Sequence, residues 1–302
     1  MTLGYDQPLY LLAFDHRGSF EKGLFDTEEP VSAQIKAGIA DAKEIIFEGH
    51  LEAIKDGAVP AAAAGVLVDE EFGASVARKA KMEGTPLAMP VERSGQDEFK
   101  FQYGGDFAEH IEAFDPTFAK VLVRYNPEGD AELNQRQTER LARLSRWLRQ
   151  HERKFLFELL VPATTEQLDR YESQGSYDKE LRPALVVQVI QRLQEADVEP
   201  DVWKIEGLDQ AEDCQRIVTQ ARSGGRDGVV CIILGRGADE AQVTEWLRVA
   251  APVNGFDGFA VGRTIWFEAL RGFLAGQIPR SEAVKTIATR YTEMYDAYTS
   301  AT

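Results

Sequence analysis

Cysteine and histidine are scarce in this 302-residue sequence. Two cysteines cannot build a disulfide framework or a four-cysteine metal site, and they suit a reducing compartment. The four histidines include no pair at metal-ligand spacing, so we predict no metal site and disfavour a zinc-dependent mechanism. The residues concerned are Cys214, Cys231, His16, His50, His110 and His151.

Positive charge is also in short supply. Lysine and arginine number 34 against 50 aspartate and glutamate residues, which gives a formal net charge of -16. This charge argues against nucleic acid or an anionic membrane as the main partner. The one arginine-rich stretch, 136–154, carries Leu141, Leu144 and Leu148 at helical spacing, which is typical of a solvated helix face rather than a nucleic-acid site.

Long hydrophobic runs and linkers are missing as well. No run approaches the length that spans a membrane, and the N-terminus lacks the basic and apolar segments of a secretion signal, so we predict a cytoplasmic protein. No stretch rich in Gly, Ser or Pro divides the chain. Because α/β barrels reach this length as one unit, we expect residues 1–302 to form a single domain.

Eight short apolar runs alternate with helical segments. Near-continuous hydrophobicity is typical of parallel strands that are buried on both faces. Eight such units close most economically into a (β/α)8 TIM barrel, with an extra C-terminal helix over about 280–298. The rival is an open doubly wound sheet, which usually carries a Gly-rich phosphate loop after its first strand, and none is present. The predicted strands are 8–14, 61–68, 85–91, 118–123, 155–161, 201–207, 228–234 and 257–261.

A single lysine, Lys204, lies in the middle of the sixth predicted strand. Strand side chains alternate, so Val202, Lys204 and Glu206 share one face. Burial disfavours the charged form of an amine, and a neutral amine is a nucleophile toward carbonyl carbon. The alternative is a strand-edge lysine whose side chain reaches water.

Two more ionisable residues sit inside neighbouring strands. Glu158 is in the fifth predicted strand and Lys120 in the fourth, so both are expected to share the barrel interior with Lys204. A cation such as Lys120 would favour the neutral form of Lys204, and Glu158 could move protons. The alternative is a structural ion pair inside the barrel.

Two glycine–arginine turns follow the last two predicted strands. Gly235-Arg236-Gly237 and Gly262-Arg263-Thr264 occupy the positions where barrels often bind phosphate through backbone N–H groups and a helix N-terminus. Arginine adds charge and a bidentate fork. The alternative is a pair of surface arginines in glycine-rich turns.

Polar residues also follow the earlier strands. The segment Asp15-His16-Arg17 after the first strand could bind substrate hydroxyls, or could simply form the polar start of a helix. Asp69 and Glu92 occupy equivalent strand ends but have no distinguishing partner in the sequence.

Eight motifs along nearly the whole chain resemble the 2-deoxy-5-keto-gluconate 6-phosphate aldolase-like family, in which this domain occurs alone or fused behind a sugar kinase. The chain is similar, more distantly, to class I tagatose-bisphosphate and sulfofructose-phosphate aldolases. The motifs are LLAFDHRGSF, AGVLVDEEFG, AMPVERSG, FAKVLVRYNPEGD, KFLFELLVP, DVWKIEGL, LGRGAD and GFAVGRTIW.

This resemblance implies roles for individual residues. The lysine of the DVWKIE strand, Lys204, would form a Schiff base, and the acid of the FELLVP strand, Glu158, would shuttle protons. Lys120 matches the lysine of the fourth strand, and Arg263 matches the anion anchor. The first strand differs, because the distant relatives have Asp-Gln-Arg where this chain has His16 in the middle; Asp15 remains a catalytic candidate.

The implied activity is that of a class I aldolase, a lyase that needs neither metal nor cofactor. The best match in substrate is 2-deoxy-5-keto-gluconate 6-phosphate, an intermediate of inositol catabolism, cleaved to dihydroxyacetone phosphate and malonate semialdehyde. Arg17 and Arg124 are the candidates for the far carboxylate, by position. The alternatives are a sulfofructose-phosphate or tagatose-bisphosphate type of aldolase, and a non-catalytic sugar-phosphate-binding barrel.

The sequence is compatible with either a single chain or a homo-oligomer. Barrels of this kind often form homo-oligomers, and the last predicted helix offers apolar residues that could cover a neighbour. We favour the simpler interpretation, in which they pack on the chain's own barrel. These residues are Tyr291, Met294, Tyr295 and Tyr298.

Overall fold

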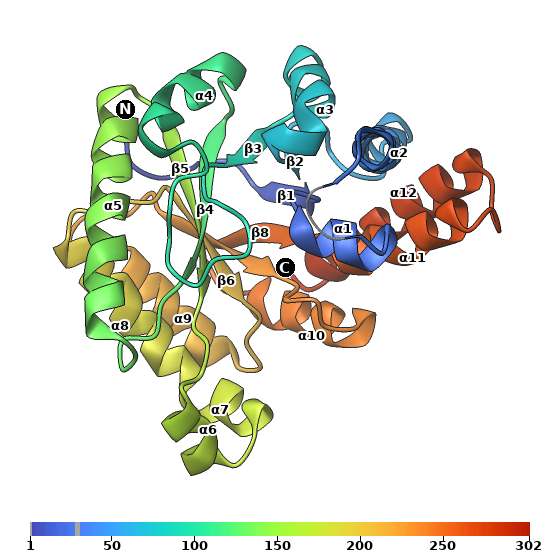
Figure 1. Ribbon diagram of the computed structural model, residues 1–302. Coiled ribbons are helices and arrows are strands. Elements are labelled where there is room, and N and C mark those ends of the chain that lie inside the picture. Colours follow the sequence, from blue (N-terminus) through green and yellow to red (C-terminus); the bar gives the residue numbers. More distant parts are fainter. Residues whose placement is uncertain (1, 28–30) are drawn as a thin grey trace.

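The computed structural model describes residues 2–27 and 31–302. Eight parallel strands pair in sequence order, and β8 pairs with β1 to close the barrel (Figure 1). The predicted (β/α)8 barrel is confirmed, and so is each of the eight predicted strands. The strands are β1 (Leu9–Ala13), β2 (Ala64–Leu67), β3 (Leu87–Pro90), β4 (Phe118–Arg124), β5 (Lys154–Leu160), β6 (Val202–Glu206), β7 (Val230–Leu234) and β8 (Phe256–Val261).

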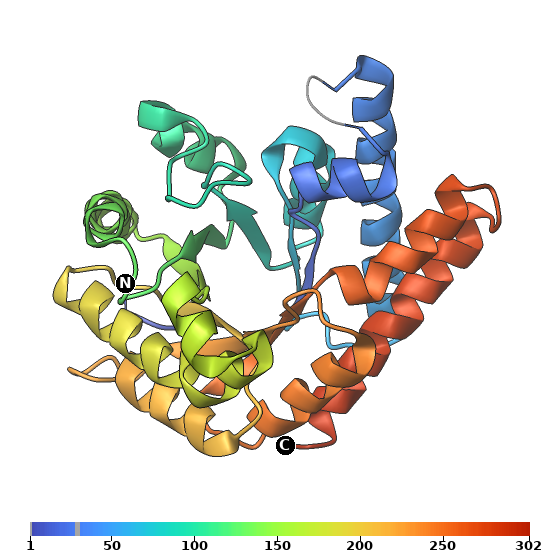
Figure 2. The same ribbon diagram turned by 60° about the horizontal axis from the view of Figure 1, so that its bottom comes forward.

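Helices surround the strands (Figures 1 and 2). In the described part of the chain, none is both long and apolar enough to cross a membrane. They are α1 (Gly18–Leu24), α2 (Ala33–Lys55), α3 (Glu70–Met82), α4 (Phe107–Phe114), α5 (Ala131–Gln150), α6 (Thr165–Tyr171), α7 (Gln174–Glu180), α8 (Arg182–Glu195), α9 (Ala211–Ala221), α10 (Glu240–Ala250), α11 (Arg263–Leu274) and α12 (Arg280–Thr299), with a short 3₁₀ turn η1 (Gly104–Asp106) before α4.

Three short helices, α1, α6 and α7, are absent from the sequence prediction. Each has seven residues, too few for an apolar stripe to repeat at the helical period. The one local signal is a capping box at the start of α6, where the side chains of Thr164 and Gln167 each bond the other's backbone N–H. Figure 1 shows α6 and α7 standing apart from the ring of helices.

The arginine-rich stretch is helical as far as Gln150, within α5. This helix begins after the cap residue Asp130 and ends at Gln150, because the chain then turns and enters β5 at Lys154. Leu141, Leu144 and Leu148 are buried. Arg143 and Arg146, which lie between them, are exposed, so the interpretation of this stretch as a helix with a solvated face is confirmed.

The N-terminal half of the barrel interior is filled with apolar side chains. Tyr5 packs against these side chains, edge-on to the ring of Phe118, with ring centroids 5.0 Å apart. Charged side chains follow further along the same strands, so they face the C-terminal mouth. The layer consists of Leu9, Leu11, Ala13, Leu67, Ala88, Phe118, Leu156, Val202, Val230, Ile232 and Ala260.

The C-terminal helix α12 packs on the chain's own barrel. It lies along α2 and α11 (Figure 2). Tyr291, Met294 and Tyr298 are buried, and the Tyr291 hydroxyl donates a 2.6 Å hydrogen bond to the carbonyl of Tyr10 in β1. This confirms the simpler of the two interpretations of these residues.

His50 in α2 is fully buried, and neither ring nitrogen has a hydrogen-bond partner among the described residues. It packs between Phe47 and Tyr291. Burial lowers the pKa of His50 to about 3. The native imidazole therefore stays neutral in mild acid, while the unfolded chain takes up a proton near pH 6.5.

Stability should accordingly fall as the pH drops below about 6.5. We expect His50 to cost the wild type about 2 kcal/mol of unfolding free energy between pH 7 and pH 5. His50→Leu should remove this slope, as measured by urea unfolding at several pH values, with the exposed His151→Leu as control. Parallel pH profiles for wild type and His50→Leu would contradict the assignment.

Candidate active site

Two adjoining cavities open at the C-terminal mouth of the barrel. The larger, of about 480 Å³, is lined by the ends of β1 and β3 and by Arg124. The smaller, of about 210 Å³, is lined by the turns after β7 and β8. Lys204, Glu158 and His16 line both cavities. These three residues therefore lie where the two cavities meet.

Lys204 and Glu158 are brought together by strand register. They are direct partners across β5 and β6, and both side chains point inward above the apolar layer. Lys204 is only 4% exposed, and its Nζ lies 2.8 Å from Oε1 of Glu158. A buried amine thus faces a carboxylate that can exchange a proton with it.

Lys120 in β4 is the centre of a cluster of carboxylates. Its Nζ lies 2.8 Å from Asp15, 2.8 Å from Glu92 and 3.0 Å from the second oxygen of Glu158. Burial opposes the charge on Lys120, but Asp15, Glu158 and Glu92 outweigh it and raise its pKa well above the ordinary value. Lys120 is therefore a fixed cation, and it reaches Lys204 through the Glu158 carboxylate that both amines contact.

The three carboxylates around Lys120 differ in their readiness to bind a proton. Burial favours protonation of each, but Lys120 overrides it at Asp15 and, with Lys204, at Glu158, and it lowers both pKa values. At Glu92 burial prevails over Lys120 and Arg17, and the pKa is raised. Asp15 and Glu158 are thus held as anions, and Glu92 is the first of the three to be protonated.

Glu92 is the member of this cluster that sequence reasoning missed. The sequence places it at a strand end together with Asp69, and nothing in the sequence separates the two. The structure separates them: Asp69 pairs with Lys43 of α2 in the core behind the barrel, whereas Glu92 faces Lys120 inside it. What distinguishes Glu92 is its hydrogen bond from Lys120, which lies 28 residues away in the sequence.

The segment after β1 contributes one cation and one neutral ring. Arg17 is buried and donates a 2.9 Å hydrogen bond to the carbonyl of Glu92, whose carboxylate lies 3.8 Å away. Burial lowers the pKa of His16 to about 4, so its ring is neutral at physiological pH. The His16 ring packs edge-on against Trp266.

The turn after β8 forms the floor of the smaller cavity. A Cβ on Gly262 would lie 2.1 Å from the carbonyl oxygen of Ala13, so only glycine fits there. Arg263 begins α11, and its guanidinium stacks on Phe267 with no carboxylate partner among the described residues. A helix start with a nearby unpaired cation can hold an anion.

The turn after β7 is arranged differently. Gly235 and Arg236 line the same cavity, but the Arg236 guanidinium already lies 2.8 Å from Glu206 and 2.7 Å from Asp178 of α7. Its charge is therefore compensated within the protein. Of the two arginines proposed as anion anchors, only Arg263 keeps an unpaired guanidinium.

Arg124 ends β4 and lines the larger cavity, which the two glycine–arginine turns do not line. Its guanidinium donates a 2.9 Å hydrogen bond to the backbone carbonyl of Gln96 and pairs with no carboxylate among the described residues. The site therefore has an unpaired arginine in each cavity, on either side of Lys204.

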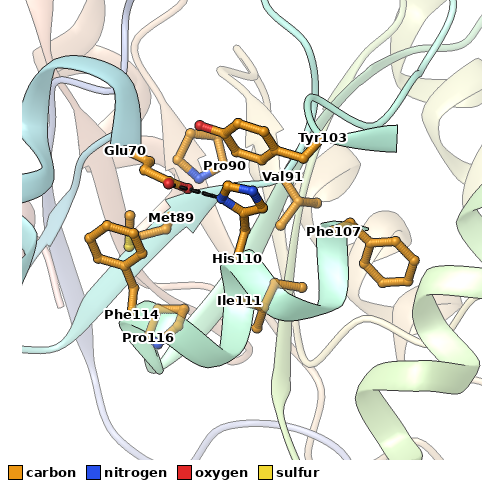
Figure 3. Close-up of a pocket in the computed structure, with 10 residues that line it drawn as sticks. All are labelled: Glu70, Met89, Pro90, Val91, Tyr103, Phe107, His110, Ile111, Phe114 and Pro116. Atoms are coloured by element: carbon orange, nitrogen blue, oxygen red, sulfur yellow. Dashed lines mark hydrogen bonds and ion pairs between the residues drawn. The ribbon is translucent and has the colours of Figure 1, made fainter. Parts of the chain in front are cut away.

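A cluster beside the barrel holds the segment that precedes α4 (Figure 3). The ring of Tyr103 stacks on His110, with centroids 3.4 Å apart, and His110 Nδ1 lies 2.9 Å from Glu70. Burial and Glu70 raise the pKa of Tyr103 to about 12. The void inside this cluster is about 20 Å³, the room of a single water, so the cluster anchors the segment rather than binding a ligand.

In residues 2–27 and 31–302, no three His, Cys, Asp or Glu side chains form a group that could hold a metal ion.

The sequence profile of the family described as "Uncharacterized protein conserved in bacteria (DUF2090)" matches residues 4–302. The chain belongs to this family. No protein of curated function matches it in sequence.

Solved structures share the fold at low sequence identity. The fructose-bisphosphate aldolase from Plasmodium falciparum, solved in complex with TRAP and a small-molecule inhibitor, is 14% identical, with a TM-score of 0.64 over 97% of this chain and 91% of that one. Cgl0159 from Corynebacterium glutamicum is 16% identical, with a TM-score of 0.59 over 98% and 88%. An archaeal fructose-1,6-bisphosphate aldolase, described with its catalytic Lys bound to the carbinolamine intermediate, is 16% identical, with a TM-score of 0.53 over 94% of both chains.

Proposed function

We propose that this protein is a class I aldolase in which Lys204 forms a Schiff base with the ketone of a phosphorylated keto-sugar or keto-sugar acid. The observation that carries the proposal is the buried Lys204 amine, 2.8 Å from Glu158, at the junction of two cavities. The archaeal neighbour, whose lysine carries a carbinolamine, lends support through the shared fold.

The reaction begins with proton transfer. Glu158 accepts a proton from the Lys204 ammonium, and the neutral amine attacks the ketone carbon to give a carbinolamine. Glu158 then protonates the departing hydroxyl, which leaves as water, and an iminium remains. The fixed charge of Lys120 keeps Glu158 ionised at the start of the cycle, because it lowers the pKa of that carboxylate.

Cleavage of the carbon–carbon bond follows. A carboxylate, Glu158 or the ionised Asp15, removes the proton from the hydroxyl on the carbon beyond the breaking bond, and an aldehyde leaves. The electron pair of the bond passes to the iminium nitrogen and forms an enamine. Protonation of the enamine carbon and hydrolysis of the resulting iminium release the ketone product and restore Lys204.

Each of the two cavities would hold one half of the substrate. The phosphate of the ketone half would lie against the backbone of Gly235 and Gly262 and against Arg263, while Arg236 holds the turn. The aldehyde half would extend past Glu158 toward Arg17 and Arg124. A phosphate at one end and a carboxylate at the other match 2-deoxy-5-keto-gluconate 6-phosphate, which yields dihydroxyacetone phosphate and malonate semialdehyde.

Replacement of Arg263 should weaken binding of the phosphate. We expect Arg263→Leu to raise KM for the phosphorylated substrate about 10- to 100-fold with a smaller change in kcat, because a charge-assisted hydrogen bond is lost. Arg271→Leu, at the exposed far end of the same helix, is the matched control. Equal KM values for the two variants would argue against the anchor.

The substrate itself is tested by condensation assays. Dihydroxyacetone phosphate is offered with malonate semialdehyde, glyceraldehyde 3-phosphate or sulfolactaldehyde, and product formation is followed. We expect the highest kcat/KM with malonate semialdehyde. A preference for one of the other aldehydes would assign a tagatose-bisphosphate or sulfofructose-phosphate type of activity, and no condensation with any of them would favour a binding protein.

A further inference from the structure

Buried polar atoms without a hydrogen-bond partner gather around the larger cavity. In the described part of the chain, four residues that line it carry such an atom: His16 Nδ1, Arg17 Nε, Glu92 Oε2 and Gln96 Oε1. A buried polar atom that lacks a partner is costly, so native structures seldom leave several together. These atoms are enclosed beside the cavity, so a polar ligand can supply the missing partners when their side chains turn toward it.

Gln96 lies on a hairpin that forms one wall of this cavity. The hairpin, residues 91–102, is closed by an isolated bridge between Glu92 and Phe101 and by hydrogen bonds of 2.9 Å on either side of it. Arg136 and Arg140 of α5 hold its tip through Glu98. The Tyr103 cluster of Figure 3 fastens its base. The hairpin is therefore a braced wall.

Gln96 and Arg124 meet on this wall. The Arg124 guanidinium donates a hydrogen bond to the backbone carbonyl of Gln96, and both residues line the same cavity. Rotation of the amide by half a turn exchanges its oxygen and its N–H₂ group, so Gln96 can present a donor to a ligand. An amide and an adjacent guanidinium together supply donors for both oxygens of a carboxylate.

We propose that Gln96 is a specificity-determining residue. Together with Arg124 it binds a carboxylate at the far end of the aldehyde half. This inference rests on the proposed aldolase function and names the group that its larger cavity selects. Arg17 and Lys120 are already paired with Glu92, whereas Arg124 and Arg93, which line the same cavity, pair with no carboxylate among the described residues.

The test separates the two halves of the reaction. Exchange of the dihydroxyacetone phosphate α-proton with deuterium from solvent needs Lys204 but no aldehyde, so it reports the ketone half alone. Condensation kinetics are then compared for malonate semialdehyde and for neutral glyceraldehyde. The variants are Gln96→Glu, which opposes a carboxylate with a negative charge, and Gln96→Met, which removes the amide without adding charge. Gln102→Glu is the control, with the same charge change on the same hairpin but outside the cavity lining.

We expect Gln96→Glu to raise KM for malonate semialdehyde about 10- to 100-fold. Its KM for glyceraldehyde and its proton exchange should stay within about twofold of wild type and of Gln102→Glu. Gln96→Met should give a smaller loss of the same kind. Equal effects on both aldehydes, or a Gln102→Glu variant that behaves like Gln96→Glu, would overturn the inference and leave the aldolase intact. Absence of proton exchange in the wild type would instead overturn the proposed function and the inference with it.

Discussion

Lys204→Met should abolish aldol cleavage, with a fall in kcat of at least about 10³-fold. Methionine has nearly the volume of the lysine stem, and Glu158 keeps its contact with Lys120, so the barrel should fold with little change in stability. What disappears is the amine that forms the iminium. Steady-state cleavage assays and thermal melts measure the two expectations separately.

Two comparisons make this result specific. Lys100→Met, on the exposed side of the hairpin, should keep wild-type activity. Glu158→Gln should lose about 10²- to 10⁴-fold in kcat, since it keeps the shape but cannot shuttle a proton. Cleavage by Lys204→Met at more than a few per cent of the wild-type rate would show that another group performs the chemistry.

Lys120→Met should destabilise the protein by about 3–5 kcal/mol, because it leaves three buried carboxylates around a position without a cation. Activity should fall as well, because Glu158 then keeps only Lys204 as a cation that favours its ionised form. Urea unfolding at neutral pH measures the loss of stability.

The pH dependence of this loss has a definite sign. In the wild type the lowered pKa values of Asp15 and Glu158 stabilise the fold above about pH 4, and that contribution disappears as the carboxylates protonate. In Lys120→Met, protonation of the same carboxylates removes their uncompensated charge and therefore stabilises the fold. The difference between the two proteins should therefore shrink from pH 7 toward pH 4.

A second substitution checks the origin of the effect. Adding Glu92→Gln to Lys120→Met removes one uncompensated charge and should recover part of the lost stability. A Lys120→Met variant as stable as wild type, or a double variant less stable than the single one, would contradict the description of Lys120 as the counter-ion of the cluster.

The strands of this fold were predictable because each is a short apolar run buried on both faces. Such a run can be recognised in the sequence without any knowledge of contacts. The same alternation placed Lys204, Glu158 and Lys120 on inward-facing positions of consecutive strands. Register then brought them together, as the pairing of Glu158 with Lys204 shows. Local pattern and barrel topology were sufficient for this part of the site.

The remaining features depend on contacts between segments that are distant in the sequence. In the sequence Glu92 and Asp69 look equivalent, and only their partners in the fold distinguish them: Asp69 pairs with Lys43, and Glu92 pairs with Lys120. In the sequence Arg236 and Arg263 look equivalent. In the fold the charge of Arg236 is compensated by Asp178, which lies on a helix that the sequence did not reveal. Charge patterns therefore identify candidate residues, whereas the side chain that stays unpaired, and so free for a ligand, is decided by tertiary packing.

Chemical reduction traps a Schiff base, so it shows whether one forms on Lys204. The protein is treated with sodium borohydride in the presence of dihydroxyacetone phosphate, digested, and examined by peptide mass spectrometry. We expect a stable adduct on the peptide that contains Lys204, dependent on the ketone and absent from Lys204→Met. An unmodified Lys204 peptide from a preparation that catalyses cleavage, or an adduct confined to another lysine, would contradict it.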